Sequence, residues 1–578
     1  MVHSRKGFPS NRPPAPTRKT SATTAPSLDP SLGLAFGNQE VGSSSMHILL
    51  YVPDNHVTRN FVPQLWPFIL KERTPAGHRV TIIDGNARRL SAAEIVQFVR
   101  DEGVDLVGMG FMTRMARTAY QVATAVRAET SARVVLGGPH VTAVPDEPLG
   151  RTGLSRVADS VVIGEADDIW PEIVADAARG ALADTYGPDG HGVKPTLDAY
   201  KAVDWESVGL GLFDLMRFVP NPLRRLLTAM GVPFQKVYVI PVESGRGCPY
   251  GCEFCSVTGF FGRDLRYRSN DSVIAELLSL KRVAKRDRAL ISVFFVDDNF
   301  AINRPRLKSL LREMIARDAC LPWTGQISVN LLDDEELVEL IHRSGGRFIF
   351  MGLESVDPAS LKSAHKAFNK PADYGRILER LARYDIYAIT SFIVGLDGDR
   401  PGTAARLEAE IAKWPPVLPV FGLLTPYPAT PLYDKLKASG RLIRPTHWLE
   451  SGSFKATFEP EGYTTESFEA ELREAWARCY RPRTFARTQR WLLERGKGMD
   501  PQITYLVSRL LFRGIYIQTS TPWAWVRLLG ANLPTIASVV VRALLRIRPR
   551  RRPVVSDATP VPDAARAELP AEGDSAAA

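Results

Sequence analysis

Two long stretches of this chain alternate short apolar runs with helical segments, and this alternation is the feature that most limits the possible folds. In the first stretch, residues 46 to about 180, we expect strands at HILLYV, RVTIID, DLVGMGF, ARVVLGG and SVVIGE. Segments with helical periodicity, among them SAAEIVQFVRDEG and RTAYQVATAVRAE, separate these strands. Such β-α-β repeats predict an α/β fold with a doubly wound parallel sheet. Ligands of such sheets bind beyond the carboxyl ends of the strands.

The second stretch runs from 236 to about 435 and contains six expected strands. They are VYVIPVE, ISVFFVD, GQISVN, RFIFMGLE, YAITSFIVG and VFGLLT. About eight strands close a β/α barrel, so six predict an open partial barrel. The loops that follow these strands form the face on which β/α barrels carry their active sites.

These patterns divide the chain into six segments. We predict a disordered tail over 1–45, the doubly wound domain over 46–180, a linker over 181–235, the partial barrel over 236–435, a helical region over 436–552 and a second disordered tail over 553–578. Both tails have few large apolar residues, so they cannot bury enough surface to offset the entropy of ordering.

The loop after the first strand of the partial barrel holds three cysteines within GRGCPYGCEFC, namely Cys248, Cys252 and Cys255. The whole chain has only five cysteines, so we expect no disulfide framework and a reducing compartment. A zinc ion needs a fourth ligand, and between Cys255 and His342 the chain offers only Cys320, far from the loop. Three thiolates instead suit a [4Fe-4S] cluster whose fourth iron stays open to a small molecule.

The Cys-x-x-x-Cys-x-x-Cys spacing after a strand resembles the signature of the radical S-adenosylmethionine (SAM) superfamily, over about residues 236–435. The resemblance implies that the open iron binds SAM and that reductive cleavage of SAM yields a 5′-deoxyadenosyl radical. It also implies an electron donor such as flavodoxin or ferredoxin. In this chemistry the cofactors react while the protein orients them.

The same resemblance assigns SAM contacts to several strand ends. Phe254 is similar to the aromatic residue that packs near the adenine, and Asp297 and Asp298 stand where the family contacts the SAM amino group, although the usual Gly-Gly-Glu is absent. Glu354 resembles the acidic ribose contact, since a carboxylate accepts from both hydroxyls. Gly395 resembles the glycine of the adenine motif, where a flat ring approaches the backbone. Each match alone also fits ordinary turn chemistry.

A doubly wound domain directly before such a core resembles the cobalamin-binding class of this superfamily. Gly137 and Gly138 in VVLGGPHVTAVPDE are similar to its nucleotide-tail loop, with Thr113 at the neighbouring strand end. His140 in the same loop either contacts the ligand or caps the loop. His56 in DNHVTR stands where methionine-synthase-like domains place a cobalt-ligating histidine, but the glycine of that motif is missing, so cobalt ligation is a hypothesis.

The predicted function is a cobalamin-dependent radical SAM enzyme, with methyl transfer to an unactivated carbon as the favoured reaction. One SAM would methylate cobalamin and a second would generate the radical that activates the substrate. An oxidative cyclase that uses both cofactors without methyl transfer is the enzymatic alternative. A sensor that binds cobalamin or the cluster is the non-enzymatic alternative.

The net charge of +10 lies largely near the termini, so we expect no nucleic-acid partner. The C-terminal helical region contains Trp523 and Trp525 and is followed by the run RIRPRRRP. This composition fits two readings about equally: a helix that binds anionic lipid, and a capping helix with a solvated basic end. We find no run of about 18 uninterrupted apolar residues, so no transmembrane helix is predicted. We therefore expect a cytoplasmic protein with possible peripheral membrane contact, acting on a small-molecule or lipid substrate whose identity stays open.

Overall fold

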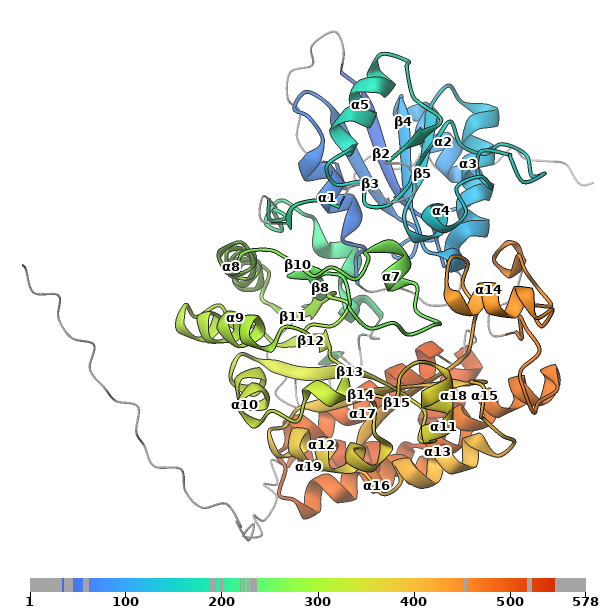
Figure 1. The fold of residues 1–578 in the computed structure, drawn as a ribbon. Coiled ribbons are helices and arrows are strands. Elements are labelled where there is room, and N and C mark those ends of the chain that lie inside the picture. Colours follow the sequence, from blue (N-terminus) through green and yellow to red (C-terminus); the bar gives the residue numbers. More distant parts are fainter. Residues whose placement is uncertain are drawn as a thin grey trace, which may run out of the picture.

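The computed structural model of the 578-residue chain describes residues 34–35, 45–55, 62–187, 194–197, 201–218, 221, 224–225, 228, 236–450, 455–516 and 522–545. These residues form a seven-stranded sheet, a six-stranded sheet and a two-stranded hairpin. Figure 1 shows the N-terminal sheet at the top, the six-stranded sheet below it and the C-terminal helices around the lower sheet. The two large sheets confirm the predicted α/β class.

The N-terminal sheet has the strand order β1-β3-β2-β4-β5-β6-β7, and every pair except β1 with β3 is parallel. Its strands are β1 (Leu34–Ala35), β2 (His47–Val52), β3 (Arg79–Asp84), β4 (Leu106–Gly110), β5 (Arg133–Gly137), β6 (Ser160–Val162) and β7 (Thr185–Tyr186). All six residues of β2 are buried, because helices cover both faces of a parallel sheet. The covering helices are α1 (Trp66–Arg73), α2 (Ala92–Asp101), α3 (Ala116–Glu129), α4 (Pro139–Ala143) and α5 (Trp170–Ala178).

Both edges of this sheet depart from the predicted segment boundaries. β1 lies inside the segment that we predict to be disordered, yet Leu34 pairs with Ile82 of β3. β7 lies in the predicted linker and pairs with β6. Each adds to an edge strand, whose open N–H and C=O groups can pair with any short extended segment. Two residues are too few to give a side-chain periodicity that a sequence pattern can reveal.

The second sheet contains six parallel strands in the order β15-β14-β13-β12-β11-β8. They are β8 (Lys236–Val242), β11 (Ala289–Phe295), β12 (Trp323–Gln326), β13 (Gly346–Glu354), β14 (Tyr387–Val394) and β15 (Val417–Leu423). The spatial order follows the chain order, and β8 does not pair with β15, so the barrel is open as predicted. Its outer helices are α8 (Asn270–Asp287), α9 (Arg304–Ala316), α10 (Glu335–Arg343), α12 (Pro371–Arg383) and α13 (Thr403–Ile411).

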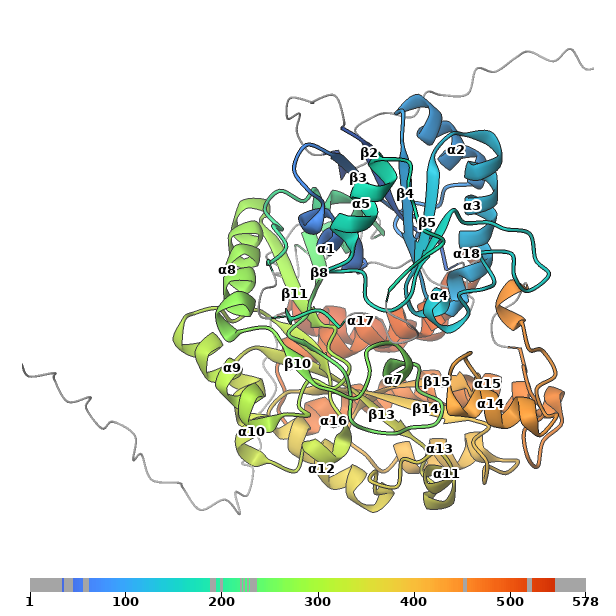
Figure 2. The ribbon, with the colours of Figure 1, turned by 45° about the horizontal axis from the view of Figure 1, so that its top comes forward.

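Short elements gather at the carboxyl ends of the barrel strands. They are the hairpin β9 (Gly245–Arg246) and β10 (Arg266–Tyr267), and the helices α7 (Val257–Phe260), α11 (Pro358–Ser363) and α14 (Pro431–Ala438). α7 packs against α4, which follows the carboxyl end of β5 in the N-terminal sheet (Figure 2). The carboxyl ends of the two sheets therefore face each other.

The described part of the linker packs between the two domains. Trp205 is fully buried, and its ring lies 5.1 Å from that of Phe68 in α1. Its indole N–H donates to the carboxylate of Glu276 in α8 over 2.7 Å. Two 3₁₀ helices, η4 (Leu210–Phe213) and η5 (Leu215–Phe218), follow this contact. Three more turns of this kind are η2 (Thr113–Met115), η6 (Val329–Leu331) and η7 (His447–Leu449).

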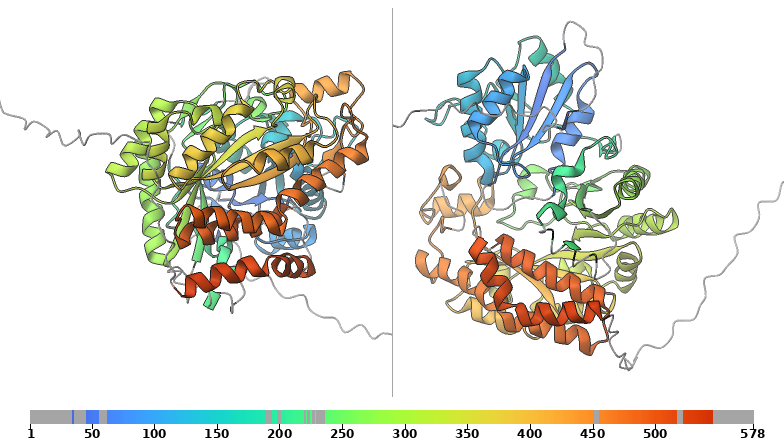
Figure 3. Two further views of the ribbon diagram at one scale, coloured as in Figure 1. Left: turned by 90° about the horizontal axis from the view of Figure 1, so that it is seen from below. Right: turned by 180° about the vertical axis from the view of Figure 1, so that it is seen from behind.

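Five helices make up the C-terminal region. They are α15 (Thr465–Cys479), α16 (Pro482–Glu494), α17 (Met499–Tyr516), α18 (Pro522–Ala531) and α19 (Leu533–Leu544). α17 packs on the edge strand β15, where the Arg509 guanidinium donates to the carbonyl of Val417 over 2.8 Å. Figure 3 shows α17, α18 and α19 together on one side of the partial barrel. In the described part of the chain, no single helix is both long and apolar enough to cross a membrane.

Candidate functional site

The three cysteines lie on the loop between β9 and β10, directly after the carboxyl end of β8. Each is half-buried and none forms a disulfide. Gly247 opens the loop with φ +96°, and a Cβ there would stand 2.2 Å from the carbonyl oxygen of Asp264, so only glycine fits. The Cys255 N–H donates to the Cys252 carbonyl over 3.1 Å. The loop thus has a fixed start and a tight turn at its end.

Burial raises the pKa of all three thiols, and that of Cys255 to about 11. At neutral pH they therefore keep their protons until a metal displaces them. No group of three or more His, Cys, Asp or Glu side chains among the described residues is placed to hold a single metal ion. This donor set does not fit zinc, whereas a [4Fe-4S] cluster fits, because it binds each thiolate at a separate iron.

Asp297 and Asp298 follow β11 and hold the base of the cysteine loop. Asp297 accepts from the Ser244 N–H over 2.9 Å and from its hydroxyl over 2.6 Å. Asp298 accepts from the Gly247 N–H over 2.9 Å. Burial raises the pKa of Asp297 to about 6 and that of Asp298 to about 7. In this structure both carboxylates therefore position the loop, and their contact with the SAM amino group stays a prediction.

A buried ion pair lies beside the cysteine loop. The Lys366 ammonium contacts the Glu354 carboxylate over 2.5 Å, with both side chains about nine-tenths buried. The same ammonium lies 5.9 Å from the ring centroid of Phe254 and 6.0 Å from that of Phe368. It also lowers the pKa of Cys252, against the larger effect of burial. Glu354 and Phe254 thus both lie near the Lys366 ammonium, and their contacts with SAM stay predictions.

The backbone around Glu354 is shaped to make this contact. Glu354 has φ +62°, and the pairing of β13 with β14 shifts register between Gly352 and Glu354. A Cβ on Gly352 would stand 2.2 Å from the Glu354 carboxylate and 2.7 Å from the Lys366 ammonium. A non-glycine residue in the left-handed region is strained, and such strain gathers at functional sites. Gly352 is therefore part of the site.

Gly395 follows β14 with φ +97°, but its open side does not face empty space. A Cβ there would stand 2.3 Å from the ring of Phe468 in α15. The Gly395 N–H donates to the Asp399 carboxylate over 2.9 Å. The ring of Phe468 therefore requires glycine at this position. The approach of a flat ligand ring to this backbone stays a prediction.

Two predicted glycines of the N-terminal domain also make close internal contacts. Gly138 has φ +90°, and a Cβ there would stand 2.7 Å from the backbone nitrogen of Phe111. A Cβ on Gly137 would lie 3.3 Å from the Cβ of Val162 in β6. Glycine is thus required at position 138, and a side chain at position 137 would crowd Val162, where the ends of β4, β5 and β6 approach each other. Their contact with a nucleotide tail stays a prediction.

His140 is fully buried, so the structure gives it no surface for a ligand. Its Nδ1 lies 3.3 Å from the Thr113 hydroxyl, which is also buried, and its Nε2 lies 3.2 Å from the Tyr120 hydroxyl. Tyr120 donates to Glu147 over 3.0 Å, and Glu147 accepts from the indole N–H of Trp448 over 3.1 Å. His140 is part of this polar core rather than a loop cap. The predicted cobalt ligand His56 lies outside the described residues.

A cluster of buried charges joins the cysteine loop to the N-terminal domain. Arg246, two residues before the first cysteine, forms ion pairs with Glu165, Asp167 and Glu243. Arg266 of β10 pairs with Glu165 over 2.6 Å. The first two carboxylates follow β6, so this cluster, which we call the Arg246 bridge, crosses the domain boundary. Arg246 and its three carboxylate partners are all more than nine-tenths buried.

Comparison with known families matches both domains. The B12 binding domain family matches residues 56–174, and the Radical SAM superfamily matches residues 242–407. The second match contains all three cysteines, and the two domains stand in the predicted order. The chain therefore contains a B12-binding domain followed by a radical SAM domain.

Curated relatives carry the same combination of domains. The B12-binding radical SAM protein is 29% identical to bacteriochlorophyllide d C-12(1)-methyltransferase of Chlorobaculum tepidum, over 62% of this chain and 71% of that protein. It is 25% identical to hopanoid C-2 methylase of Rhodopseudomonas palustris, over 84% and 87%. It is also 25% identical to anaerobic magnesium-protoporphyrin IX monomethyl ester cyclase of Cereibacter sphaeroides, over 68% and 64%.

Among solved structures, the fold is similar to that of the radical SAM methyltransferase TsrM from Kitasatospora setae, solved with tryptophan substrate and the SAM analogue aza-SAM. The TM-score is 0.56, with 17% identity, over 75% of this chain and 89% of that one. At this identity the similarity supports the fold alone. The B12-binding radical SAM protein thus has the two-domain architecture expected from its sequence.

Sequence reasoning missed Arg246, Lys366 and Gly352. Arg246 stands inside the quoted cysteine motif, but an arginine in a loop gives no sign of its partners. Lys366 lies twelve residues after Glu354, beyond α11, so no local spacing links the two side chains. Gly352, two residues before the predicted acidic residue Glu354, is the one available signal, because a glycine inside a strand indicates a bulge or a close approach.

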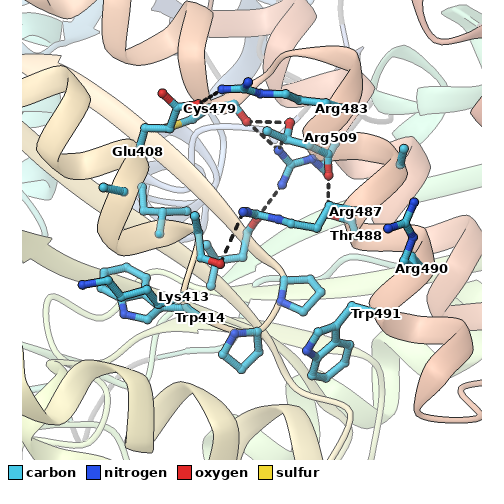
Figure 4. Close-up of a pocket in the computed structure, with 18 of the residues that line it drawn as sticks. Glu408, Lys413, Trp414, Cys479, Arg483, Arg487, Thr488, Arg490, Trp491 and Arg509 are labelled. Atoms are coloured by element: carbon cyan, nitrogen blue, oxygen red, sulfur yellow. Dashed lines mark hydrogen bonds and ion pairs between the residues drawn. The ribbon is translucent and has the colours of Figure 1, made fainter.

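One large cavity lies away from this site. It has a volume of about 740 Å³ and is lined from α13, α15, α16, α17 and the start of β15, with Lys413, Arg487, Arg490 and Trp491 around it (Figure 4). Because the cysteine loop follows the carboxyl end of β8 and the cavity lies at the amino end of β15, the two are at opposite ends of the sheet. None of the predicted site residues lines the cavity.

Proposed function

We propose that this B12-binding radical SAM protein is a cobalamin-dependent methyltransferase that acts on an unactivated carbon. The observation that carries the proposal is the position of the cysteine loop. It lies at the carboxyl end of the partial barrel and faces the carboxyl end of the B12-binding sheet, with α7 packed on α4. Ligands of both fold types bind at these ends, so two cofactors would share one space.

The residues of the chain have distinct tasks in this proposal. Cys248, Cys252 and Cys255 would hold three irons of a [4Fe-4S] cluster and leave the fourth for SAM. When bound, the cluster and SAM supply a carbon radical and cobalamin supplies the methyl group. Phe254 and the Lys366–Glu354 pair lie beside the loop, where they would orient the nucleoside part of SAM. An electron donor such as flavodoxin or ferredoxin is a further prediction of the proposal.

A fixed, charged pair also suits a polar ligand group at this place. Lys366 is an ammonium held in a buried site by Glu354, and burial alone would lower its pKa. The pairing with Glu354, together with smaller contributions from Cys252 and Cys255, outweighs burial, so the pKa of Lys366 is raised and the group stays charged. Fixed charges in a water-excluded site act more strongly than in water and need no reorganisation. This pair is therefore suited to hold a polar ligand group beside the cluster.

The proposal is tested by anaerobic reconstitution of the full chain with iron, sulfide and cobalamin. Cys248→Ala, Cys252→Ala and Cys255→Ala should each lose bound iron and 5′-deoxyadenosine formation from SAM. The matched control is Cys320→Ala, at a half-buried cysteine outside the loop. Incubation of cell extract with SAM labelled in its methyl group should then give a product that carries the labelled methyl. Iron content and deoxyadenosine formation unchanged in the three loop variants would overturn the proposal.

An oxidative cyclase is the second candidate, favoured by the similarity to the magnesium-protoporphyrin IX monomethyl ester cyclase. Both reactions consume SAM and produce 5′-deoxyadenosine, so the cluster variants do not separate them. The product does, because a cyclase adds no carbon from SAM. If the product lacks the labelled methyl group and has lost hydrogen relative to the substrate, cyclisation and not methyl transfer is the reaction.

A further inference from the structure

The last two described helices form a corner with an exposed apolar surface. α18 and α19 meet at a bend of 69° and lie on the outer side of α17 (Figure 3). Trp523 is 75% exposed, Leu533 is 61% exposed and Leu545 is 66% exposed. The other large exposed apolar residues of this corner are Val526, Leu529, Val541 and Leu544. We call these seven side chains the corner surface. Large exposed apolar side chains concentrated on two adjacent helices indicate an interaction site.

The corner is attached to the rest of the protein by its opposite face. Val539 and Ala543 of α19 are buried, and α19 packs against α16 and α17. Trp525 packs so closely on α17 that a Cβ on Gly514 would stand 2.2 Å from its ring. Asn532, between the two helices, is buried. The exposed side chains therefore sit on a packed scaffold.

The charge of this region identifies the partner. Residues 501–556 contain nine arginines and neither aspartate nor glutamate. Arg527 is exposed beside the corner surface, and the run RIRPRRRP follows α19 directly. A second copy of the chain would bring like charge against like charge on this surface. A partner that accepts both apolar groups and arginines must be anionic and must have an apolar interior.

We propose that the corner surface docks the protein on the surface of an anionic lipid bilayer. The apolar side chains of α18 and α19 would enter the boundary between headgroups and acyl chains, with Trp523 at headgroup depth. The arginines after α19 would bind the anionic headgroups, each adding to the affinity. Together the two helices are long and apolar enough for a broken membrane span, but they meet at a bend of 69° and pack on α16 and α17, which favours two short helices that lie in the interface. This inference is independent of the proposed methyl transfer.

The test is flotation of the purified full chain with vesicles. One set contains equal parts of phosphatidylcholine and phosphatidylglycerol, and the other contains phosphatidylcholine alone. The protein should float with the anionic vesicles, and molar salt should release much of it, because salt screens the arginines. Arg550→Gln, Arg551→Gln and Arg552→Gln together should lower the partition coefficient about a hundredfold, from roughly fivefold per arginine.

The apolar contribution has its own variant. Trp523→Ala with Leu533→Ala should weaken binding to anionic vesicles by at least about tenfold, because two exposed side chains lose their burial in lipid. The matched controls remove equal numbers of exposed groups elsewhere. They are Leu154→Ala with Ile443→Ala for the apolar change, and the triple replacement by glutamine of Arg343, Arg376 and Arg473 for the charge.

Three results would overturn the proposal. The first is absence of flotation with anionic vesicles at low salt. The second is binding that the control variants reduce as much as the corner variants do. The third is a wild-type dimer in analytical ultracentrifugation that Trp523→Ala with Leu533→Ala converts to a monomer, which would make the corner surface a subunit interface. Deoxyadenosine formation from SAM should stay unchanged in all variants, which separates this test from that of the proposed function.

Discussion

Substituting Arg246 with methionine removes one guanidinium from a buried cluster of three carboxylates and so tests what holds the two domains together. Methionine keeps the apolar stem but not the charge. Of the carboxylates, Glu165 retains Arg266 as a partner, whereas Asp167 and Glu243 lose the guanidinium that both contact. Removing one partner of a buried ion pair costs about 3–5 kcal/mol, since the remaining charge stays buried without compensation. We expect a loss at the upper end of this range.

The assay is urea unfolding of the wild type and the variant, followed by tryptophan fluorescence. Because two of the three carboxylates belong to the N-terminal domain, most of the loss should appear as weaker domain contact. A cost of 3–5 kcal/mol corresponds to a change of roughly a hundredfold to a few thousandfold in the equilibrium between docked and separated domains. Small-angle X-ray scattering should then show a larger radius of gyration for Arg246→Met.

Two matched variants define the result. Arg343→Met removes an exposed ion pair with Glu339 and should change stability by less than about 0.5 kcal/mol. Arg246→Lys restores one positive charge but not the planar fork, so it should recover only part of the loss. An Arg246→Met protein with wild-type unfolding and wild-type scattering would refute the claim that the Arg246 bridge couples the domains.

Two further predictions concern single buried positions. Gly352→Ala should lower the free energy of unfolding in urea by about 1–3 kcal/mol, because its Cβ would overlap the Glu354 carboxylate. The control Gly422→Ala in β15 has open space around the new Cβ and should be nearly neutral. Equal effects of the two substitutions would contradict the role of Gly352. Burial raises the pKa of Asp84 from 3.8 to about 6. As the pH rises, the folded state therefore keeps this proton to a higher pH than the unfolded state does. The free energy of unfolding should fall between about pH 4 and pH 6 and then level off. The total decrease should be up to about 3 kcal/mol, and Asp84→Asn should abolish it. A free energy of unfolding that depends on pH in the Asp84→Asn variant as it does in the wild type would contradict this prediction.

The sequence predicts the two sheets well because each long strand can be recognised from the apolar pattern of its own residues. HILLYV is buried along its whole length, and a strand buried on both faces must be apolar at every position. The six runs of the second series likewise predict an open barrel, since their number is too small for closure. Family comparison supports the same two units. The short edge strands β1 and β7 could not be predicted in this way, because two residues are too few to show a pattern of apolar side chains.

The site is less predictable, because its contacts join residues far apart in the chain. His140 shows this clearly: from sequence it stands in a loop beside a ligand, but the indole of Trp448 and the carboxylate of Glu147 help to enclose it. Trp448 lies 301 residues after Glu147, and no local pattern relates the two. At Gly395 the structure adds a neighbour that the sequence does not indicate, the ring of Phe468, while the contact with a ligand ring stays a prediction.

These long-range contacts explain why the two domains face each other with their ligand-binding ends. Arg246 follows β8, and its partners Glu165 and Asp167 follow β6, so the bridge joins the carboxyl ends of two different sheets. Trp448 makes a second contact across the same boundary, on the polar core that contains His140. Two separated contacts prevent rotation about either one. A cofactor at the end of one sheet is thereby fixed relative to a cofactor at the end of the other, as a reaction that passes a group between them requires, because small misplacements are costly in such steps.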